Sequence, residues 1–181
     1  MQSVEIIPEV GQWRSRGVRY YSGPWDQLMS VIPEFELRAF RDAPGYPDNP
    51  FLKTVVRLPT SPTENPIPVG VVSNSYGLAP HRRVAELCRE GLINAGVQAR
   101  DMRFEVGLSE LGEWMNFRIY MPSAFTVRDH MGQEVGLRLE CYNSVDGSSR
   151  LIIVFGWLFS GGAPPAEPSP LSPGYSSKEC A

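Results

Sequence analysis

The sequence contains few of the residues that most often build metal-binding or reactive sites. Only 2 histidines and 3 cysteines occur among its 181 residues. His81 and His130 stand near no cysteine and in no acidic spacing typical of a metal site. Cys88, Cys141 and Cys180 lie far apart, which is typical of reduced thiols rather than of a disulfide framework. We therefore expect no metal site, surface or capping roles for the histidines, and core positions for Cys88 and Cys141.

Long apolar runs are missing as well. The longest, residues 151–159, is interrupted by Gly156 and falls far short of the roughly 18 apolar residues that span a bilayer. The chain does not open with a basic stretch followed by an apolar one, so no secretory signal is expected. It has no Walker or Rossmann glycine loop, and no nucleophile stands beside a base. These absences favour a cytoplasmic protein with no membrane contact, no cofactor and no catalytic residues.

Lysine is nearly absent. The 17 basic residues are 15 arginines and two lysines, Lys53 and Lys178. GC-rich coding explains such an excess without any function. A functional reason would be planar recognition of phosphate, carboxylate or bases. The net charge of −3 counts against non-specific duplex binding, which draws most of its affinity from neutralised phosphates.

Apolar residues recur at helical spacing in two places. A short helix is predicted from Ser22 to about Ile32, because Pro24 fits a first turn and Pro33 ends it. The main helix is predicted at Pro80–Ala95, where Gly96 supplies the stop. Its buried stripe should consist of Val84, Leu87, Cys88 and Leu92.

After Gly96 the apolar period changes from 3.6 to 2. Residues 102–108, 115–121 and 137–141 alternate, which indicates an antiparallel meander with one face in the core. Residues 151–159 are nearly all apolar, as in a strand covered on both faces. Earlier strands are predicted at Phe51–Leu58 and Val69–Ser73, with loops at 42–50 and 59–68.

The predicted fold class is α+β, a mostly antiparallel sheet of about five or six strands with one main helix packed on it. Residues 1–21 should form an N-terminal arm or edge strand, and residues 22–162 the α+β domain. Residues 163–181 are rich in proline, serine and glycine and should form a tail without a core of its own.

The segment Asn143–Arg150 is the most informative motif. Asp146-Gly147 favours a tight turn between two strands, and neighbouring asparagine and serine side chains can bond to the local backbone. The alternative is a polar loop tip that contacts a partner through Asn143, Asp146 and Ser148. Catalysis there is not expected, because no histidine or cysteine is adjacent.

That segment carries a family resemblance. Asn143-Ser-Val-Asp-Gly-Ser-Ser149, preceded by Leu-Arg-Leu and followed by an apolar strand, resembles the phage/plasmid-like family of unknown function, whose members lie in prophages and on plasmids. Val145 stands where the family's loop usually has histidine. Residues 24–33 and 69–78 are similar to the family's early helix and its strand–helix unit. The likeness covers about residues 22–162 and implies a shortened member, because Phe159-Ser-Gly-Gly162 stands where the family continues into a second half.

One further group of residues projects from the outward face of the predicted sheet. Arginines and aromatics side by side on strands can stack bases and pair with phosphates. The alternative is ordinary cross-strand pairing, with an arginine opposite Glu105 or Glu140. We expect Glu105, Glu110 and Glu113 to be solvated. The candidate binding residues are Arg103, Arg118, Tyr120, Arg138 and Tyr142.

Three functional hypotheses follow from these patterns. The first is a non-enzymatic binding protein of a phage, prophage or plasmid. It would act in the bacterial cytoplasm on a host protein or ribonucleoprotein complex, as an anti-CRISPR or anti-restriction inhibitor. The second is a single-stranded nucleic-acid-binding or annealing accessory protein. The third, an enzyme of unrecognised type, needs a pocket with convergent ionisable groups. The sequence leaves open a homodimer through an exposed strand edge.

Overall fold

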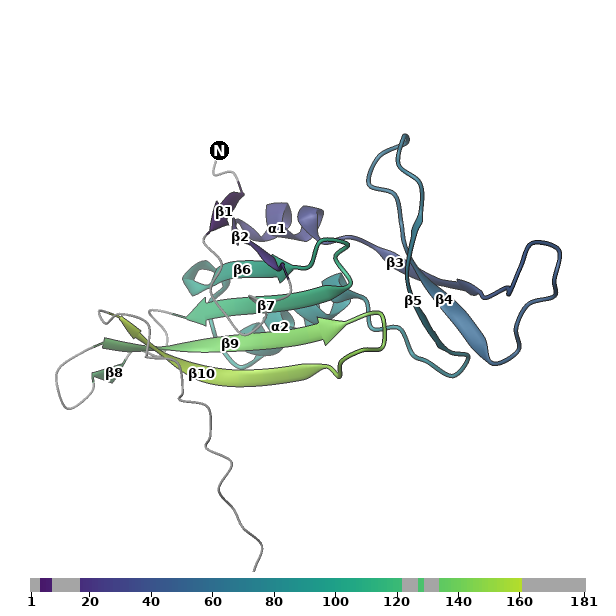
Figure 1. Ribbon diagram of the computed structural model, residues 1–181. Helices are drawn as coiled ribbons and strands as arrows, with labels where there is room; N and C mark the ends of the chain where they lie inside the picture. The colour runs from purple at the N-terminus through teal and green to yellow at the C-terminus, as the bar shows by residue number, and fades with distance from the viewer. Residues whose placement is uncertain (1–3, 8–16, 122–126, 129–133, 161–181) are drawn as a thin grey trace, which may run out of the picture.

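The computed structural model describes residues 4–7, 17–121, 127–128 and 134–160. Within these ranges it has two α-helices and two antiparallel sheets, so the predicted α+β class is confirmed (Figure 1). The predicted tail, residues 163–181, and His130 lie outside the described residues. No helix in the described part of the chain is long and apolar enough to cross a membrane.

The main sheet has the strand order β1-β2-β6-β7-β9-β10, with β8 pairing beside β9. The strands from β6 onward form the predicted meander, and β1 is an edge strand within the predicted N-terminal arm. The short 3-10 helix Ala99–Asp101 precedes β6. The strands are β1 (Glu5–Ile7), β2 (Arg19–Gly23), β6 (Arg103–Leu108), β7 (Trp114–Met121), β8 (Val127–Arg128), β9 (Glu134–Ser144) and β10 (Ile152–Ser160).

Two helices cover one face of this sheet and form the main core with it. Helix α1 (Trp25–Val31) lies over β2 and β6, where the Trp25 ring packs edge-on against Phe104. Helix α2 (His81–Asn94) lies over β7 and β9. The alternating apolar residues of the meander point toward these helices, as the period of 2 predicted.

The main helix forms where it was predicted, one residue shorter at each end. It buries Val84, Cys88 and Leu92, and Cys88 meets Cys141 of β9 as a pair of buried free thiols. The predicted burial of Leu87 is wrong, because 51% of that residue is exposed. Arg89, two positions further along α2, lies over Trp25 of α1, so Leu87 lies on the flank of α2 turned away from α1.

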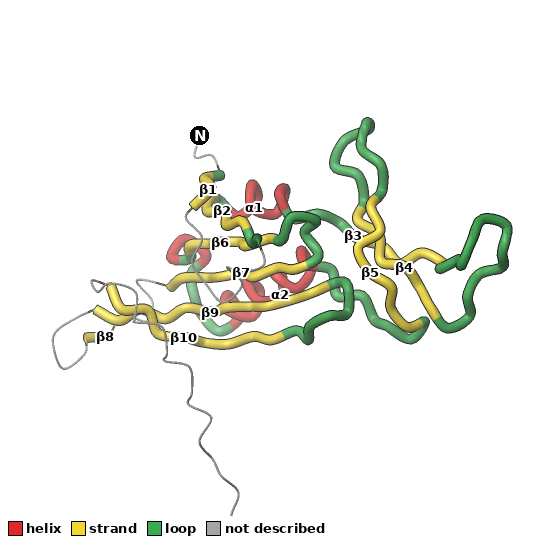
Figure 2. The backbone as a smooth tube through the Cα atoms, viewed as in Figure 1, coloured by secondary structure: helices red, strands yellow, loops and turns green. Residues whose placement is uncertain are grey.

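A second, three-stranded sheet was not predicted. It consists of β3 (Phe35–Ala39), β4 (Leu52–Arg57) and β5 (Ile67–Ser73) and stands at one end of the main sheet (Figure 1). The two predicted strands became β4 and β5, but β5 starts within the predicted loop 59–68. Figure 2 shows the long loops that join these strands reaching beyond them.

The loop between β9 and β10 holds the two sheets together. Val145 is fully buried and packs in a small core with Phe35, Val55 and Val72 of the three-stranded sheet. The connection spans residues 145–151, so the predicted tight turn at Asp146-Gly147 is wrong. A longer loop is needed because its tip reaches the second sheet.

Strand β10 differs most from its predicted environment. It is the last strand of the main sheet, pairing with β9 on one side, and no described strand pairs with its other side. Its apolar side chains are 40–61% exposed from Ile152 to Trp157, leaving Gly156 aside. The expectation of a strand covered on both faces is therefore wrong for the single chain.

Candidate functional site

The five predicted binding residues all lie on the sheet face opposite the helices. The register of β6, β7 and β9 aligns the residues of this face into three cross-strand rungs. We call them the outer, middle and inner rung. They are, in that order, Arg103–Tyr120–Arg138, Glu105–Arg118–Glu140 and Gly107–Asn116–Tyr142.

The middle rung is a buried ion cluster. The side chain of Arg118 is only 3% exposed, and its Nε lies 2.7 Å from Glu140 Oε1. Its Nη1 lies 3.5 Å from Glu105 Oε2, and its guanidinium stands 4.5 Å from the ring centroid of Tyr20. Arg118 is therefore paired across the strands, which is the alternative that the sequence left open. It is enclosed by partners from its own chain.

Tyrosine hydroxyls also donate hydrogen bonds to the two carboxylates of this cluster. Tyr120 donates to Glu105 and Tyr142 donates to Glu140, each at 2.7 Å. Burial raises the pKa of Tyr120 to about 12 and also raises the pKa of Tyr142, so both hydroxyls stay protonated donors at neutral pH. The expectation of a solvated Glu105 is wrong, because its side chain is 19% exposed and bonded on the sheet.

The accessible part of the sheet face opposite the helices lies at the outer rung. Arg103 is exposed, and Arg138 is 26% exposed with its guanidinium 5.7 Å from the ring centroid of Tyr120. Arg138 also pairs with Glu140, Nη2 to Oε1 at 3.1 Å. Of the five predicted binding residues, only Arg103, Tyr120 and Arg138 present an arginine–aromatic surface. Arg103 and Arg138 stand on either side of Tyr120 in the register, so this rung offers positive charge beside an aromatic ring to a phosphate or a base.

The predicted loop tip is mostly built into the fold. The Asn143 amide donates to Ala79 O and to His81 Nδ1, both at 2.9 Å, and His81 Nε2 donates to Gly112 O at 3.0 Å. These bonds suit the neutral Nε2–H tautomer. His81 is completely buried, so the predicted surface or capping role is wrong for this residue.

Asp146 fixes the other side of the same loop. It accepts hydrogen bonds from Trp114 Nε1 at 3.2 Å and from the amide and hydroxyl of Ser148 at 3.0 and 2.6 Å. Burial opposes ionisation of Asp146, but the bonds from Ser148 and Trp114 hold its pKa below the usual range. The local bonding expected of these residues is confirmed, and Gly147 and Ser148 remain exposed at the tip.

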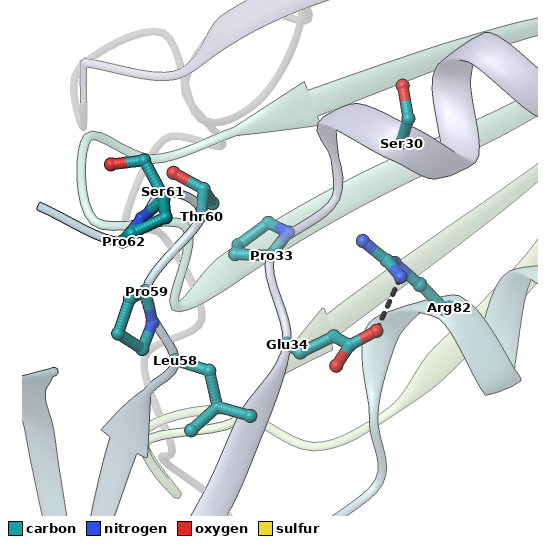
Figure 3. Close-up of a pocket in the computed structure, with 9 residues that line it drawn as sticks. All are labelled: Ser30, Pro33, Glu34, Leu58, Pro59, Thr60, Ser61, Pro62 and Arg82. Carbon is teal, nitrogen blue, oxygen red and sulfur yellow. Dashed lines mark hydrogen bonds and ion pairs between the residues drawn. The ribbon is translucent and has the colours of Figure 1, made fainter. Parts of the chain in front are cut away.

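A separate pocket of about 600 Å³ opens where α1 runs into β3 and meets the loop after β4 (Figure 3). Its two ionisable residues, Glu34 and Arg82, pair with each other at 2.5 Å. Both are substantially exposed, at 59% and 37%. The remaining lining residues are hydroxyl, proline and leucine side chains, and the one carboxylate that lines the pocket is paired with Arg82.

No family model, curated protein or solved structure matches this chain. No group of three or more histidine, cysteine or acidic residues that could hold a metal ion occurs in the described ranges. Two surfaces remain as candidates, the outer rung and the exposed apolar strand β10. The exposure of β10 could not be inferred from the sequence, because its all-apolar pattern is the one expected of a covered strand.

The buried histidine predicts a loss of stability in acid. Burial lowers the pKa of His81 to about 4, whereas the unfolded chain takes up this proton near pH 6.5. Stability from His81 is thus complete above pH 6.5 and falls as the pH drops toward 4. We expect the free energy of unfolding to drop by about 3 kcal/mol over that range from this residue. Urea unfolding of wild type and His81→Gln checks this. An equally steep pH dependence in the variant would contradict it.

Proposed function

We propose that this chain is a non-enzymatic protein-binding protein of a mobile element, acting on a host protein or ribonucleoprotein complex in host–element conflict. The observation that carries protein binding is the exposed apolar surface of β10, where Phe155 and Trp157 are 61% and 59% exposed. Contiguous exposed apolar surface marks sites of association more often than catalysis. The resemblance of the loop at Asn143 to phage- and plasmid-borne proteins supports the mobile-element origin.

Charge and geometry favour a protein partner over nucleic acid. The net charge is −3, and Arg118 is enclosed by two carboxylates instead of facing outward. Only the outer rung favours the alternative, single-stranded nucleic-acid binding, through Arg103, Tyr120 and Arg138. Such binding would weaken steeply with salt, because it depends on neutralised phosphates.

Capture of host proteins tests the proposal. Tagged wild-type protein should retain a defence component from host lysate, and its expression should rescue phage plating. Phe155→Lys should lose both effects, because it places a charge in the exposed apolar surface. Phe51→Lys is the matched control, since Phe51 is an exposed phenylalanine just before β4, away from β10.

Two results would count against the proposal. One is a wild type that retains no defence component and does not rescue plating. The other is tight, salt-sensitive binding of single-stranded DNA that Arg103→Ala abolishes, which would favour the alternative.

A further inference from the structure

Strand β10 has the sequence of an interior strand and the position of an edge strand. All its described side chains are apolar, apart from Gly156, and both of its faces are exposed. Natural edge strands are usually protected by lysine, proline, an inward charge or a bulge. Strand β10 has none of these, and its register with β9 is continuous from Ile152 to Ser160. An interior position in a larger sheet accounts for both its sequence and its regular pairing.

The exposed surface continues from the strand onto the helix layer. Ile153, Phe155 and Trp157 pair with Cys141, Leu139 and Leu137, and so stand on the face that carries the core. Arg89 of α2 lies over Trp25 of α1, and Leu87 lies on the opposite side of the α2 helix. Leu87 therefore borders the part of the sheet face that α2 leaves uncovered next to β10.

We propose that a second copy of this chain covers the surface, with the two β10 strands paired antiparallel about a two-fold axis. This inference rests on the proposed function in taking β10 as a protein-binding surface, and it makes the β10-paired dimer the form that binds the host partner. A two-fold contact brings the same patch of both copies together, so any charge in the patch is present twice in the interface and close to its own kind. Strand β10 carries no charge and therefore meets its equivalent without repulsion.

The available area suits such a contact. A buried aromatic side chain removes about 150–250 Å² from water, and a large aliphatic one somewhat less. Strand residues 152–155 and 157, with Leu151 just before them, are each 40–61% exposed. These six side chains offer about 500 Å² per copy, or about 1,000 Å² for two, which is the lower limit for a stable interface. Leu87 and the newly paired backbone add to this sum.

Solution mass measured over a range of concentrations tests the proposal on the full chain. Wild type should sediment as a dimer that dissociates on dilution, and Phe155→Lys as a folded monomer. Phe51→Lys should remain a dimer, because it places the same charge just before β4, away from β10. A wild type that stays monomeric at the highest soluble concentration would overturn the proposal, as would dimerisation that Phe155→Lys leaves intact.

A cysteine scan tests the antiparallel arrangement. In a Cys180→Ser background, single cysteines are placed in turn at positions 152 to 158 and oxidised. Two-fold pairing predicts crosslinked dimers at one central position, with yields that fall off on both sides. Equal crosslinking along the strand, or none, would overturn it. The proposed function and the dimer can fail independently. If a monomeric wild type captures a host protein and Phe155→Lys does not, the dimer is overturned, the proposed function stands, and β10 is the surface that binds the host partner.

Discussion

Replacing Arg118 by methionine should lower the free energy of unfolding by about 3–5 kcal/mol, the cost of breaking a buried ion pair by removing one partner. Arg118 is the only cation of the middle rung, and its removal leaves Glu105 and Glu140 facing each other across β7. Their tyrosine donors remain and Arg138 still pairs with Glu140, but the two carboxylates then share one poorly solvated site without the cation between them. The midpoint of urea unfolding at neutral pH measures the loss.

Two further variants separate this effect from a general loss of arginine. Arg38→Met breaks an ion pair with Glu36 whose side chains are 47% and 44% exposed, so it should cost no more than about 1 kcal/mol. Adding Glu105→Gln and Glu140→Gln to Arg118→Met removes the two carboxylates that repel each other and should recover part of the stability. A cost for Arg118→Met as small as that for Arg38→Met would contradict a stabilising role for the buried ion cluster.

The sequence predicted the meander and the main helix because their apolar periods are long and regular. Strands β6, β7 and β9 alternate over six or more residues, and α2 repeats its apolar stripe over three turns. It did not predict β3, because Phe35–Ala39 is short and carries two charged residues in five. The second sheet was missed for that reason.

The predicted site could be only partly correct, because an alternating pattern shows which residues share a face but not whether that face is open. Arg118 and Tyr120 are two positions apart on one strand, yet Arg118 is enclosed and Tyr120 borders solvent. The difference arises from long-range contacts, such as Tyr20 of β2 stacking on Arg118. Likewise, the burial of His81 depends on Asn143 and Gly112, which lie 62 and 31 residues away in the sequence.

A second large effect is expected at Gly112, in the turn between β6 and β7. Its φ of 77° lies in the left-handed region, and a Cβ added there would stand 2.5 Å from Cγ of Pro33. The conformation costs about 1–2 kcal/mol for alanine, and overpacking adds about 1–3 kcal/mol. Gly112→Ala should therefore lower the free energy of unfolding by about 2–5 kcal/mol, measured by urea unfolding.

Gly96→Ala is the matched control, because Gly96 has a φ of 94° with no atom within 4 Å of the added Cβ. It should show the conformational cost alone, and the excess at Gly112 then measures the contact with Pro33. Adding Pro33→Ala to Gly112→Ala should relieve that excess. Equal losses in the two glycine variants would show that the turn moves away from Pro33 freely. A large excess would mean that one turn holds α1, β3 and, through its bond to His81, α2 in place.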